Sequence, residues 1–572
     1  MKRFLMLLLV VLLALGTTLS ALAAAEPSPN AGLVNTDPNS IKVANELVEF
    51  SVLARGKPPV NERGTYWWVD FVEKEMNIKL NIEFIDAGVF REKLTILAQT
   101  DSLPDMIMAS ATIWSADVMT WGMEDQLFLA IDKYREYAPR YFAEIEKQPE
   151  LVAATTTPDG HTYGFSNIRV VNEGQSMGIF TITNTEWLDR LGMEMPTTLD
   201  EFYNMLVAFR DEDANGDGDP TNEIPWQGAN SGGYPERIFV NWAFGINGYR
   251  WDAVDSYTYE GYFSPYHPRY KESIAFMKKC WDEGLFQSTF FSGTGEENFA
   301  YGQANTDYTY YGFSVDLDRT QMTGNKDLWS SYSAQIPVIA DDSVVRSTWK
   351  GLPIDLFTWT INASTKYPEV AVAFLDSFYD PYLSILYTYG PEFGSEYDYY
   401  GTGWEYDPET QSMTYPNNTY ANKGDYNYVQ EQNTIMDGAT FGLEGSTAAK
   451  YYFDDWKYGL GWSEEEARWQ KTLAENNYPY EMPQYLSTVF YTDEEKEIYD
   501  TYRAPLQNYM MAQEALFISG ERDWDEFDDY MKELDDMGGQ VFNELLKTKL
   551  AAHLEMLGIK SPAQLEAEGK AE

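Results

Sequence analysis

Residues 47–108 read LVEFSVLARGKPPVNERGTYWWVDFVEKEMNIKLNIEFIDAGVFREKLTILAQTDSLPDMIM, and this stretch decides the fold class. Apolar residues alternate in some parts of it and recur at helical spacing in others. The pattern predicts a strand at 47–53, a helix from 67 to about 76, a strand at 78–85, a helix from 90 to about 99 and a third strand ending at 108. Strands that alternate with helices are typical of an α/β sheet with crossover helices.

The rest of the chain extends the same pattern. Thr198 and Glu201 have the spacing of a capping box, and a one-sided apolar face follows them. We expect a strand near 358–362, a helix that opens at Pro368, and a mostly helical region that begins with a second capping box at Thr492. With 572 residues, the chain is long enough for several structural units.

Composition excludes several functional classes. The formal net charge of −49 disfavours nucleic acid and anionic membrane surfaces as partners, because both would be repelled. Hydrophobic residues make up 44% of the chain, enough for sizeable cores. A single cysteine, Cys280, rules out an internal disulfide framework, and the three scattered histidines have no zinc-binding spacing, which argues against a zinc enzyme.

The first 25 residues predict export. Lys2 and Arg3 precede an apolar run over 4–15, and alanines at 21, 23 and 25 complete the pattern of a cleaved signal peptide. The apolar run is shorter than the ~20 residues of a membrane anchor. With no cysteine near the cleavage site and no later membrane-spanning stretch, we expect an extracytoplasmic protein that is not lipidated, whose residues 26–41 form a flexible leader.

The sharpest local motif is DEDANGDGDPTNE at 211–223. Asp213, Asn215 and Asp217 alternate around a glycine turn, as calcium ligands do in an EF-hand loop, and Asp219 could add its carbonyl. The terminal glutamate stands at loop position 11 instead of 12, so the loop is EF-hand-like only. We favour a structural calcium site over a solvated acidic turn, because so many carboxylates in one turn would otherwise repel each other.

Aromatic residues are abundant, with 17 Trp, 42 Tyr and 30 Phe. A sugar site needs flat side chains, because a sugar ring presents an apolar C–H face between polar edges. For any single aromatic residue, core packing is the stronger expectation. As ligand-binding candidates outside the amphipathic periodicity we select five residues: Trp114, Trp242, Tyr311, Trp359 and Trp404.

Four stretches carry a resemblance to the extracellular solute-binding proteins, family 1, of ABC sugar importers, in the large oligosaccharide- and alginate-binding branch. They are EKL at 92–94 with LPDM at 103–106, NTEWLDRLG at 184–192 with MPTTLDEF at 195–202, the acidic loop running into NEIP at 222–225, and FISG at 517–520 with WD at 524–525. The loop carries Asn-Glu where the commonest form of this branch has Asp-Glu, and it is one residue longer.

The resemblance implies a bilobal periplasmic-binding-protein fold of two α/β lobes joined by a hinge, with a helical C-terminal region. We place lobe one at 42–165 and 353–425, lobe two at 166–352 and 426–560, and a tail at 561–572. Carried over from the family, the calcium ligands fall on Asp213, Asn215, Asp217, Asp219, Asn222 and Glu223.

The function implied by the resemblance is capture of an oligosaccharide between the lobes and delivery to the permease subunits of an ABC importer, by a monomer without catalytic activity. Two alternatives remain open from the sequence. One is a secreted glycoside hydrolase or polysaccharide lyase, although no nucleophile elbow, P-loop or dinucleotide motif is found. The other is an importer subunit that binds a peptide.

Overall fold

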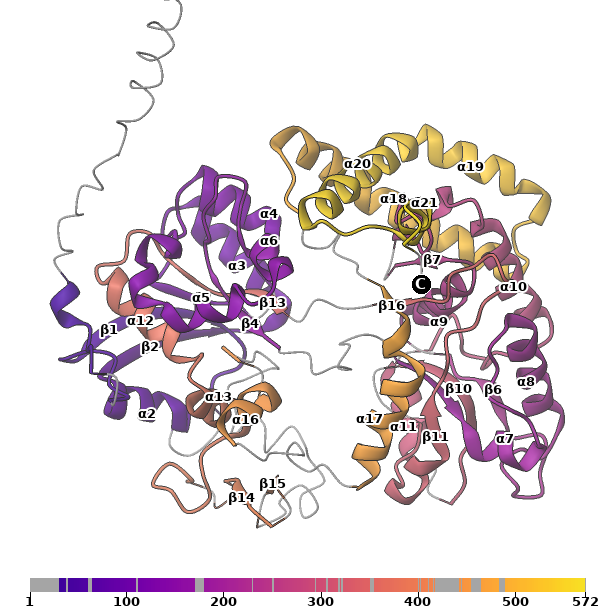
Figure 1. Ribbon diagram of the computed structural model, residues 1–572, viewed down its shortest axis with the longest axis horizontal. Helices are drawn as coiled ribbons and strands as arrows, with labels where there is room; N and C mark the ends of the chain where they lie inside the picture. The colour runs from indigo at the N-terminus through magenta and orange to yellow at the C-terminus, as the bar shows by residue number, and fades with distance from the viewer. Residues whose placement is uncertain are drawn as a thin grey trace, which may run out of the picture.

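The computed structural model describes the chain from residue 30 to residue 570 with gaps: 30–37, 40–59, 64–109, 112–169, 180–228, 230–248, 251–293, 295–304, 307–316, 319, 322–349, 354–399, 401, 403–409, 411–414, 416, 442–443, 445–453, 464–482 and 489–570. Figure 1 shows two bodies, each built around its own sheet. The predicted signal peptide lies outside the described residues.

Lobe one contains a five-stranded sheet in the order β2-β1-β3-β13-β4. Its strands are β1 (Val48–Arg55), β2 (Ile78–Ile85), β3 (Met106–Met108), β4 (Phe165–Ile168) and β13 (Ile354–Ile361). β1 pairs in parallel with β2 and β3, whereas β13 is antiparallel to both β3 and β4. The strand–helix–strand pattern predicted from residues 47–108 is therefore confirmed.

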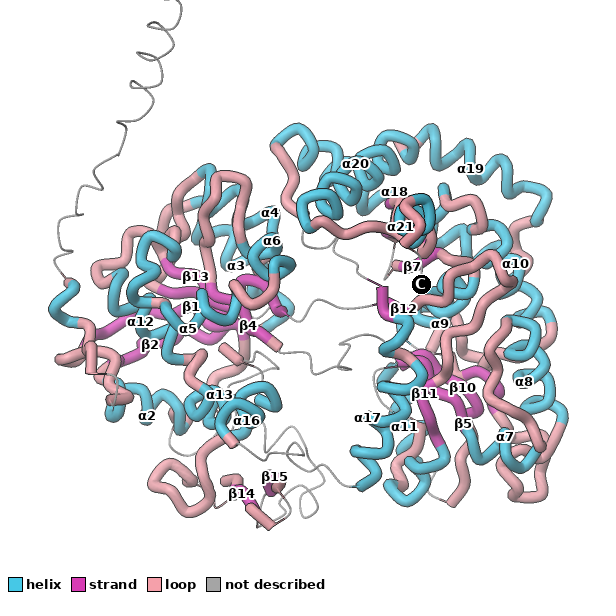
Figure 2. The backbone as a smooth tube through the Cα atoms, viewed as in Figure 1, coloured by secondary structure: helices cyan, strands magenta, loops and turns pink. Residues whose placement is uncertain are grey.

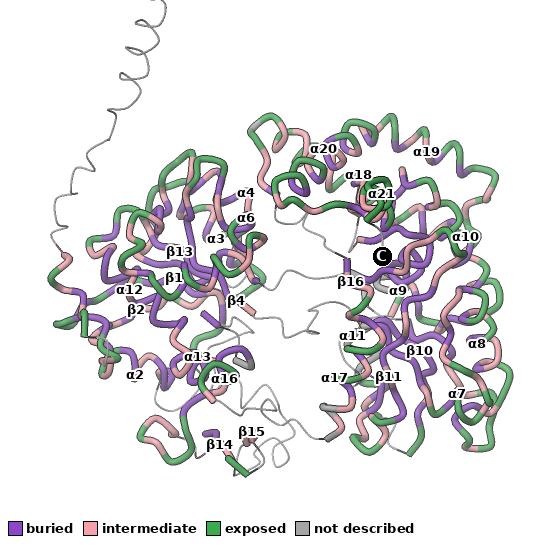
Figure 3. Tube along the Cα trace, in the orientation of Figure 1, coloured by how far each residue is buried: buried purple, intermediate pink, exposed green. Residues whose placement is uncertain are grey.

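Helices cover this sheet (Figure 2). They are α2 (Trp67–Met76), α3 (Ala87–Gln99), α4 (Ser115–Asp117), α5 (Pro139–Ile145), α6 (Pro149–Thr155), α12 (Pro368–Ser377), α13 (Pro381–Tyr389) and α16 (Gly445–Tyr452). The small hairpin of β14 (Glu405–Asp407) and β15 (Ser412–Thr414) lies beside α13 and α16 in Figure 2. The apolar faces of sheet and helices form the buried interior of this lobe, drawn purple in Figure 3.

Lobe two is built on a four-stranded sheet in the order β11-β5-β10-β6. Its strands are β5 (Phe180–Asn184), β6 (Ile224–Trp226), β10 (Tyr311–Asp316) and β11 (Tyr332–Ala334). Its helices are α7 (Thr185–Leu191), α8 (Leu199–Asp211), α9 (Asn230–Ala243), α10 (Tyr270–Asp282), α11 (Gly295–Ala304) and α17 (Glu464–Asn476). The predicted capping box is present: Thr198 accepts from Glu201 N, and the Glu201 carboxylate accepts from Thr198 N.

The C-terminal region is helical, as predicted. It comprises α18 (Asp493–Ser519), α19 (Phe527–Asp536), α20 (Gly539–Leu557) and α21 (Pro562–Ala567). These helices pack on lobe two, beside the small sheet of β7 (Ile246–Asn247), β8 (Asp252–Asp255) and β9 (Gly261–Phe263). A further pair, β12 (Thr348–Trp349) with β16 (Glu481–Met482), lies on the side of lobe two toward lobe one in Figure 2.

Three of the predicted boundaries need correction. Leu443 and residues 445–453 belong with lobe one, not lobe two, because Leu443 bridges to Ile168 and α16 packs on α13. The leader is not wholly free, since Val34 is buried in the lobe-one core and bridges to Ala44. The tail contains α21, and the Tyr257 hydroxyl of lobe two donates to its Glu566.

A buried carboxylate in lobe one makes stability depend on pH. The side chain of Asp376 in α12 is 2% exposed and accepts from Tyr141 N (2.8 Å) and from Arg140 Nη1 (3.2 Å). Burial raises the pKa of Asp376 to about 6, and the two hydrogen bonds oppose that shift only in part. Between pH 4 and pH 6 the native protein therefore holds a proton that the unfolded chain has released.

We expect this difference to appear in the free energy of unfolding. Relative to the Asp376→Asn variant, the wild-type protein should lose up to about 3 kcal/mol of stability as the pH rises from 4 to 7, because more protons are bound in the native state over that range. Urea unfolding of both proteins at several pH values measures the difference. A difference that stays constant, or rises with pH, would contradict the assignment.

Candidate functional site

The facing edges of the two sheets define where a ligand can meet both lobes. In lobe one, the carboxyl ends of β1, β3 and β4 lie at one edge, because β4 and β3 both run antiparallel to β13. The chain leaves lobe one after β4 and returns at β13 on this same edge. Ligands of open α/β sheets bind outside the carboxyl ends of the strands. In Figure 1, α4 and α6 lie on the side of lobe one that faces lobe two.

Lobe two presents the corresponding edge. The chain enters it at the amino end of β5, so the carboxyl ends of the neighbouring β10 and of β6 lie on that side. Gln227, which follows β6, is fully buried, and its side chain lies within hydrogen-bonding reach of the Tyr311 hydroxyl. Its backbone is paired as well, because Gln227 N donates to the carbonyl of Phe313 at 2.9 Å, so Gln227 is a packing residue of this edge. Nothing in the sequence around Gln227 signals this environment.

Of the five predicted aromatic residues, Trp114 is the one with an exposed ring. It follows β3, precedes α4, and is 55% exposed. The guanidinium of Arg91, from α3, lies over the Trp114 ring with its central carbon 3.9 Å from the ring centroid. One face of the indole is therefore covered by protein, and the ring still presents a large area to solvent.

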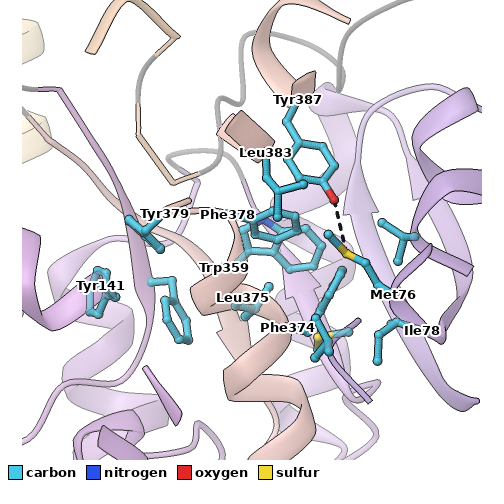
Figure 4. Close-up of a cluster of buried hydrophobic side chains, with 14 of the residues drawn as sticks. Met76, Ile78, Tyr141, Trp359, Phe374, Leu375, Phe378, Tyr379, Leu383 and Tyr387 are labelled. Carbon is cyan, nitrogen blue, oxygen red and sulfur yellow. Dashed lines mark hydrogen bonds between the residues drawn. The ribbon is translucent and has the colours of Figure 1, made fainter. Parts of the chain in front are cut away.

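The other four predicted residues are core side chains. Trp359 is 2% exposed and stacks on Phe378 at 6.0 Å between ring centroids, in the interior shown in Figure 4. Trp242 and Trp404 are each 3% exposed, and Tyr311 has no exposed surface. Tyr311 also begins β10, at the end of the strand away from the entry edge. The structure thus gives these four residues a packing role and does not bring them together with Trp114.

Lobe two contacts the segment that carries Trp114. Residues 118–124 after α4 form a π-helical turn, a conformation frequent at functional sites. Lys496 of α18 donates from Nζ to Thr120 Oγ1 at 3.2 Å. Phe490 packs on the lobe-one core beside this turn, whereas its neighbour Val489 is buried in the core of lobe two. These two adjacent residues are therefore anchored in different lobes.

The predicted calcium loop follows α8 and precedes β6, at the end of lobe two away from the entry edge. Asn215 Nδ2 donates to Asn222 Oδ1 at 2.8 Å, and Asn222 Nδ2 donates to Asp217 Oδ2 at 2.7 Å. Asp219 instead accepts from Thr221 through Oδ1. No group of three His, Cys, Asp or Glu side chains within the described ranges is close enough together to hold a metal ion. The six predicted ligands are thus not all gathered around one point.

Two carboxylates of the loop nevertheless fit a cation. Asp213 Oδ1 and Glu223 Oε2 are buried and accept no hydrogen bond from any described group. Burial raises the pKa of Glu223, and the charges of Asp213 and Asp217 raise it further, although hydrogen bonds to main-chain N–H groups oppose this. Buried carboxylate oxygens without donors are suitable ligands for a hard cation such as calcium.

Solved structures share the fold of this chain. One match is the HMO-binding, ABC-transporter-associated solute-binding protein of Bifidobacterium longum infantis ATCC 15697, with a TM-score of 0.69 and 18% identity. The match covers 90% of this chain and all of that chain. A FusA structure from S. pneumoniae, an EF-hand mutant in complex with fructo-nystose, matches over 89% of this chain with a TM-score of 0.66 and 20% identity, again over the full length of that chain. The fold is that of the bilobal solute-binding proteins.

A particular relative is recognised in sequence as well. The chain is a homologue of the fructooligosaccharide ABC transporter substrate-binding protein FusA of Streptococcus pneumoniae serotype 4, with 26% identity over 486 residues that cover 82% of this chain and 83% of FusA. No protein-family model matches the chain. The predicted resemblance to ABC-importer binding proteins is confirmed, and these relatives are transport proteins, not enzymes. No helix in the described part of the chain has the length and apolar character to cross a membrane.

Proposed function

We propose that this protein is the extracytoplasmic solute-binding component of an ABC importer and captures an oligosaccharide between its two lobes. The observation that carries the proposal is the exposed ring of Trp114, which directly precedes α4, and α4 lies on the side of lobe one toward lobe two in Figure 1. A flat apolar ring bordered by polar groups suits the C–H face of a sugar. The homologous FusA is named for fructooligosaccharides, which supports a carbohydrate as ligand.

In this account, the sugar stacks on Trp114 and receives hydrogen bonds from polar groups of lobe two. A ligand that contacts both lobes favours the closed arrangement of the lobes over the open one. A shift of that equilibrium from 1:99 to 99:1 requires about 5.5 kcal/mol of differential binding, which a few stacking and hydrogen-bonded contacts can supply. The membrane subunits of the importer then receive the ligand from the closed form.

Calorimetry on the full mature chain tests the proposal. The panel consists of kestose, a neutral milk oligosaccharide, polygalacturonate fragments and a mixed peptide library. We expect saturable heat with at least one glycan, no glycan turnover, and a higher melting temperature in its presence. Binding of peptides alone, or release of reducing ends from a glycan by the purified chain, would contradict the proposal.

We further propose that the loop after α8 binds calcium in a structural role. Asp213 and Glu223 supply the buried carboxylates, and Asn215, Asp217, Asp219 and Asn222 complete the set expected from the family resemblance. When bound, the ion would neutralise the carboxylates and fix the turn between α8 and β6. The FusA EF-hand mutant supports a loop of this type in a relative.

Removal of calcium is expected to destabilise lobe two. Excess chelator should lower the melting temperature of the wild-type protein, and added calcium should restore it, because an ion that binds only the native state stabilises it by mass action. The Glu223→Gln variant should show little response to either. Calcium-insensitive melting of the wild type, with no calcium found by elemental analysis, would remove the ion from the account.

We also propose that residues 1–25 are removed on export. The mature protein should then begin at Glu26, which the intact mass of the secreted chain measures directly. A mass that includes the first 25 residues would contradict this assignment.

A further inference from the structure

The exposed ring of Trp114 is held in place by neighbouring side chains. A mobile side chain that becomes fixed on ligand binding costs about 0.5–1.5 kcal/mol, so an aromatic platform binds more tightly when its orientation is fixed beforehand. Arg91 provides such a restraint, because its guanidinium lies flat enough to approach the ring within 3.9 Å of the centroid. Contacts of this kind combine stacking with cation–π attraction.

Arg91 is itself held at three points. Its Nη1 donates to Asp117 Oδ2 (2.5 Å) and to the carbonyl of Thr112 (2.8 Å), and its Nη2 donates to Asp117 Oδ1 (2.6 Å). Two parallel bonds between a guanidinium and a carboxylate fix the plane of the guanidinium as well as its position. The plane that faces Trp114 is therefore set by Asp117.

Asp117 also holds the main chain of the platform. Its Oδ2 accepts from Trp114 N at 2.8 Å, so one carboxylate restrains both the backbone of Trp114 and the guanidinium over the indole ring. The Asp117 side chain is 8% exposed, which protects these hydrogen bonds from exchange with water. α3, which carries Arg91, is anchored by Phe90 and Leu94 in the lobe-one core. The arrangement thus rests on rigid elements.

We propose that Asp117 is a positioning residue that acts through Arg91 to hold Trp114 as a pre-oriented stacking platform for a sugar ring. This inference rests on the proposed function and adds to it the residues that set the affinity of the Trp114 subsite. Asp117 itself does not touch the sugar. Its contribution to binding should therefore depend on the presence of the Trp114 ring.

A double-mutant cycle tests this dependence. The proteins are wild type, Asp117→Asn, Trp114→Ala and the double variant, and the probe is whichever of kestose, a neutral milk oligosaccharide or a polygalacturonate fragment binds the wild type most tightly. We expect Asp117→Asn to weaken binding about fivefold in the wild-type background. In the Trp114→Ala background the same change should alter affinity less than twofold.

Two further variants separate positioning from folding. Arg91→Lys keeps the charge but loses the planar fork, and we expect it to weaken binding about as much as Asp117→Asn, with an unchanged melting temperature. Arg140→Gln is the matched control, because Arg140 also pairs with a buried aspartate of lobe one but has no contact with Trp114. It should leave glycan affinity unchanged.

Tryptophan fluorescence provides a readout without ligand. The Trp114 signal, obtained as the difference between wild type and Trp114→Phe, should show faster anisotropy decay once Asp117→Asn is introduced into both proteins. The inference would be overturned, and the proposed function left standing, by either of two results. One is an equal loss of glycan affinity on Asp117→Asn with and without the Trp114 ring, and the other is unchanged affinity and anisotropy in the Asp117→Asn protein. Absence of glycan binding by the wild type, or wild-type affinity in Trp114→Ala, would overturn the proposed site together with it.

Discussion

Replacing Glu514 with alanine is expected to destabilise lobe two by about 3–5 kcal/mol, because it removes one partner of a buried ion pair. Glu514 of α18 pairs with Arg237 of α9, and the two side chains are 7% and 4% exposed. The Tyr270 hydroxyl of α10 also donates to Glu514 and lies 3.4 Å from the Tyr530 hydroxyl of α19. The Glu514 carboxylate thus connects three helices, and the Tyr270 hydroxyl links a fourth, α19. The Glu514→Ala change removes this carboxylate from the buried charge of Arg237.

Urea unfolding followed by circular dichroism measures this effect. The control is Glu475→Ala, which removes the carboxylate of the Lys471–Glu475 pair of α17, whose side chains are 71% and 62% exposed. Surface pairs of this kind contribute about 0–1 kcal/mol, so the control should unfold nearly as the wild type does. Equal stability of the two variants would contradict the role given to the Glu514 network.

Replacing Trp114 with alanine is expected to weaken glycan binding by about 30-fold, with little change in stability. The indole face offers a sugar an apolar area whose burial is worth about 2 kcal/mol, and 1.4 kcal/mol corresponds to a tenfold change in affinity. Stability should change little because the ring is 55% exposed and outside the buried cores.

Calorimetry with the tightest-binding glycan measures this loss, and Phe393→Ala serves as the control. Phe393 is an aromatic residue of the same lobe with a comparable exposure of 41%, and its backbone N–H donates to Trp404 O in a different segment from the one that carries Trp114. Its removal should not affect affinity. A Trp114→Ala protein with wild-type affinity would mean that the sugar does not stack at this position.

Local patterns predicted the elements of the fold well where one physical cause dominates. The strand at 78–85 was predicted with the bounds it has in the structure, because alternation is strict there. The capping boxes at Thr198 and Thr492 are present, because their hydrogen bonds depend on four consecutive residues only. The assignment to lobe two was wrong for residues 445–453, because α16 packs on α13 of lobe one, which is a long-range contact.

The candidate site was harder to predict for the same reason. Trp114 and Trp359 look alike in sequence, since both lie outside an amphipathic pattern, yet one is exposed and the other lies in the lobe-one core. Trp114 lies in the loop between β3 and α4, whereas Trp359 lies within β13 and points into the core. Only the tertiary structure determines this difference. Arg91 and Asp117 carried no signal at all, because their pairing joins α3 to α4 across 26 residues. The acidic loop was recognisable because its residues are contiguous.

The most direct test of the central claim is the distance between the lobes with and without glycan. Spin labels at Ile96→Cys in α3 and Lys471→Cys in α17 report on lobe one and lobe two, and both native side chains are exposed whereas Cys280 is buried. The account predicts that a glycan that gives calorimetric heat shortens this distance. Saturable glycan binding with an unchanged distance would contradict capture by closure of the two lobes.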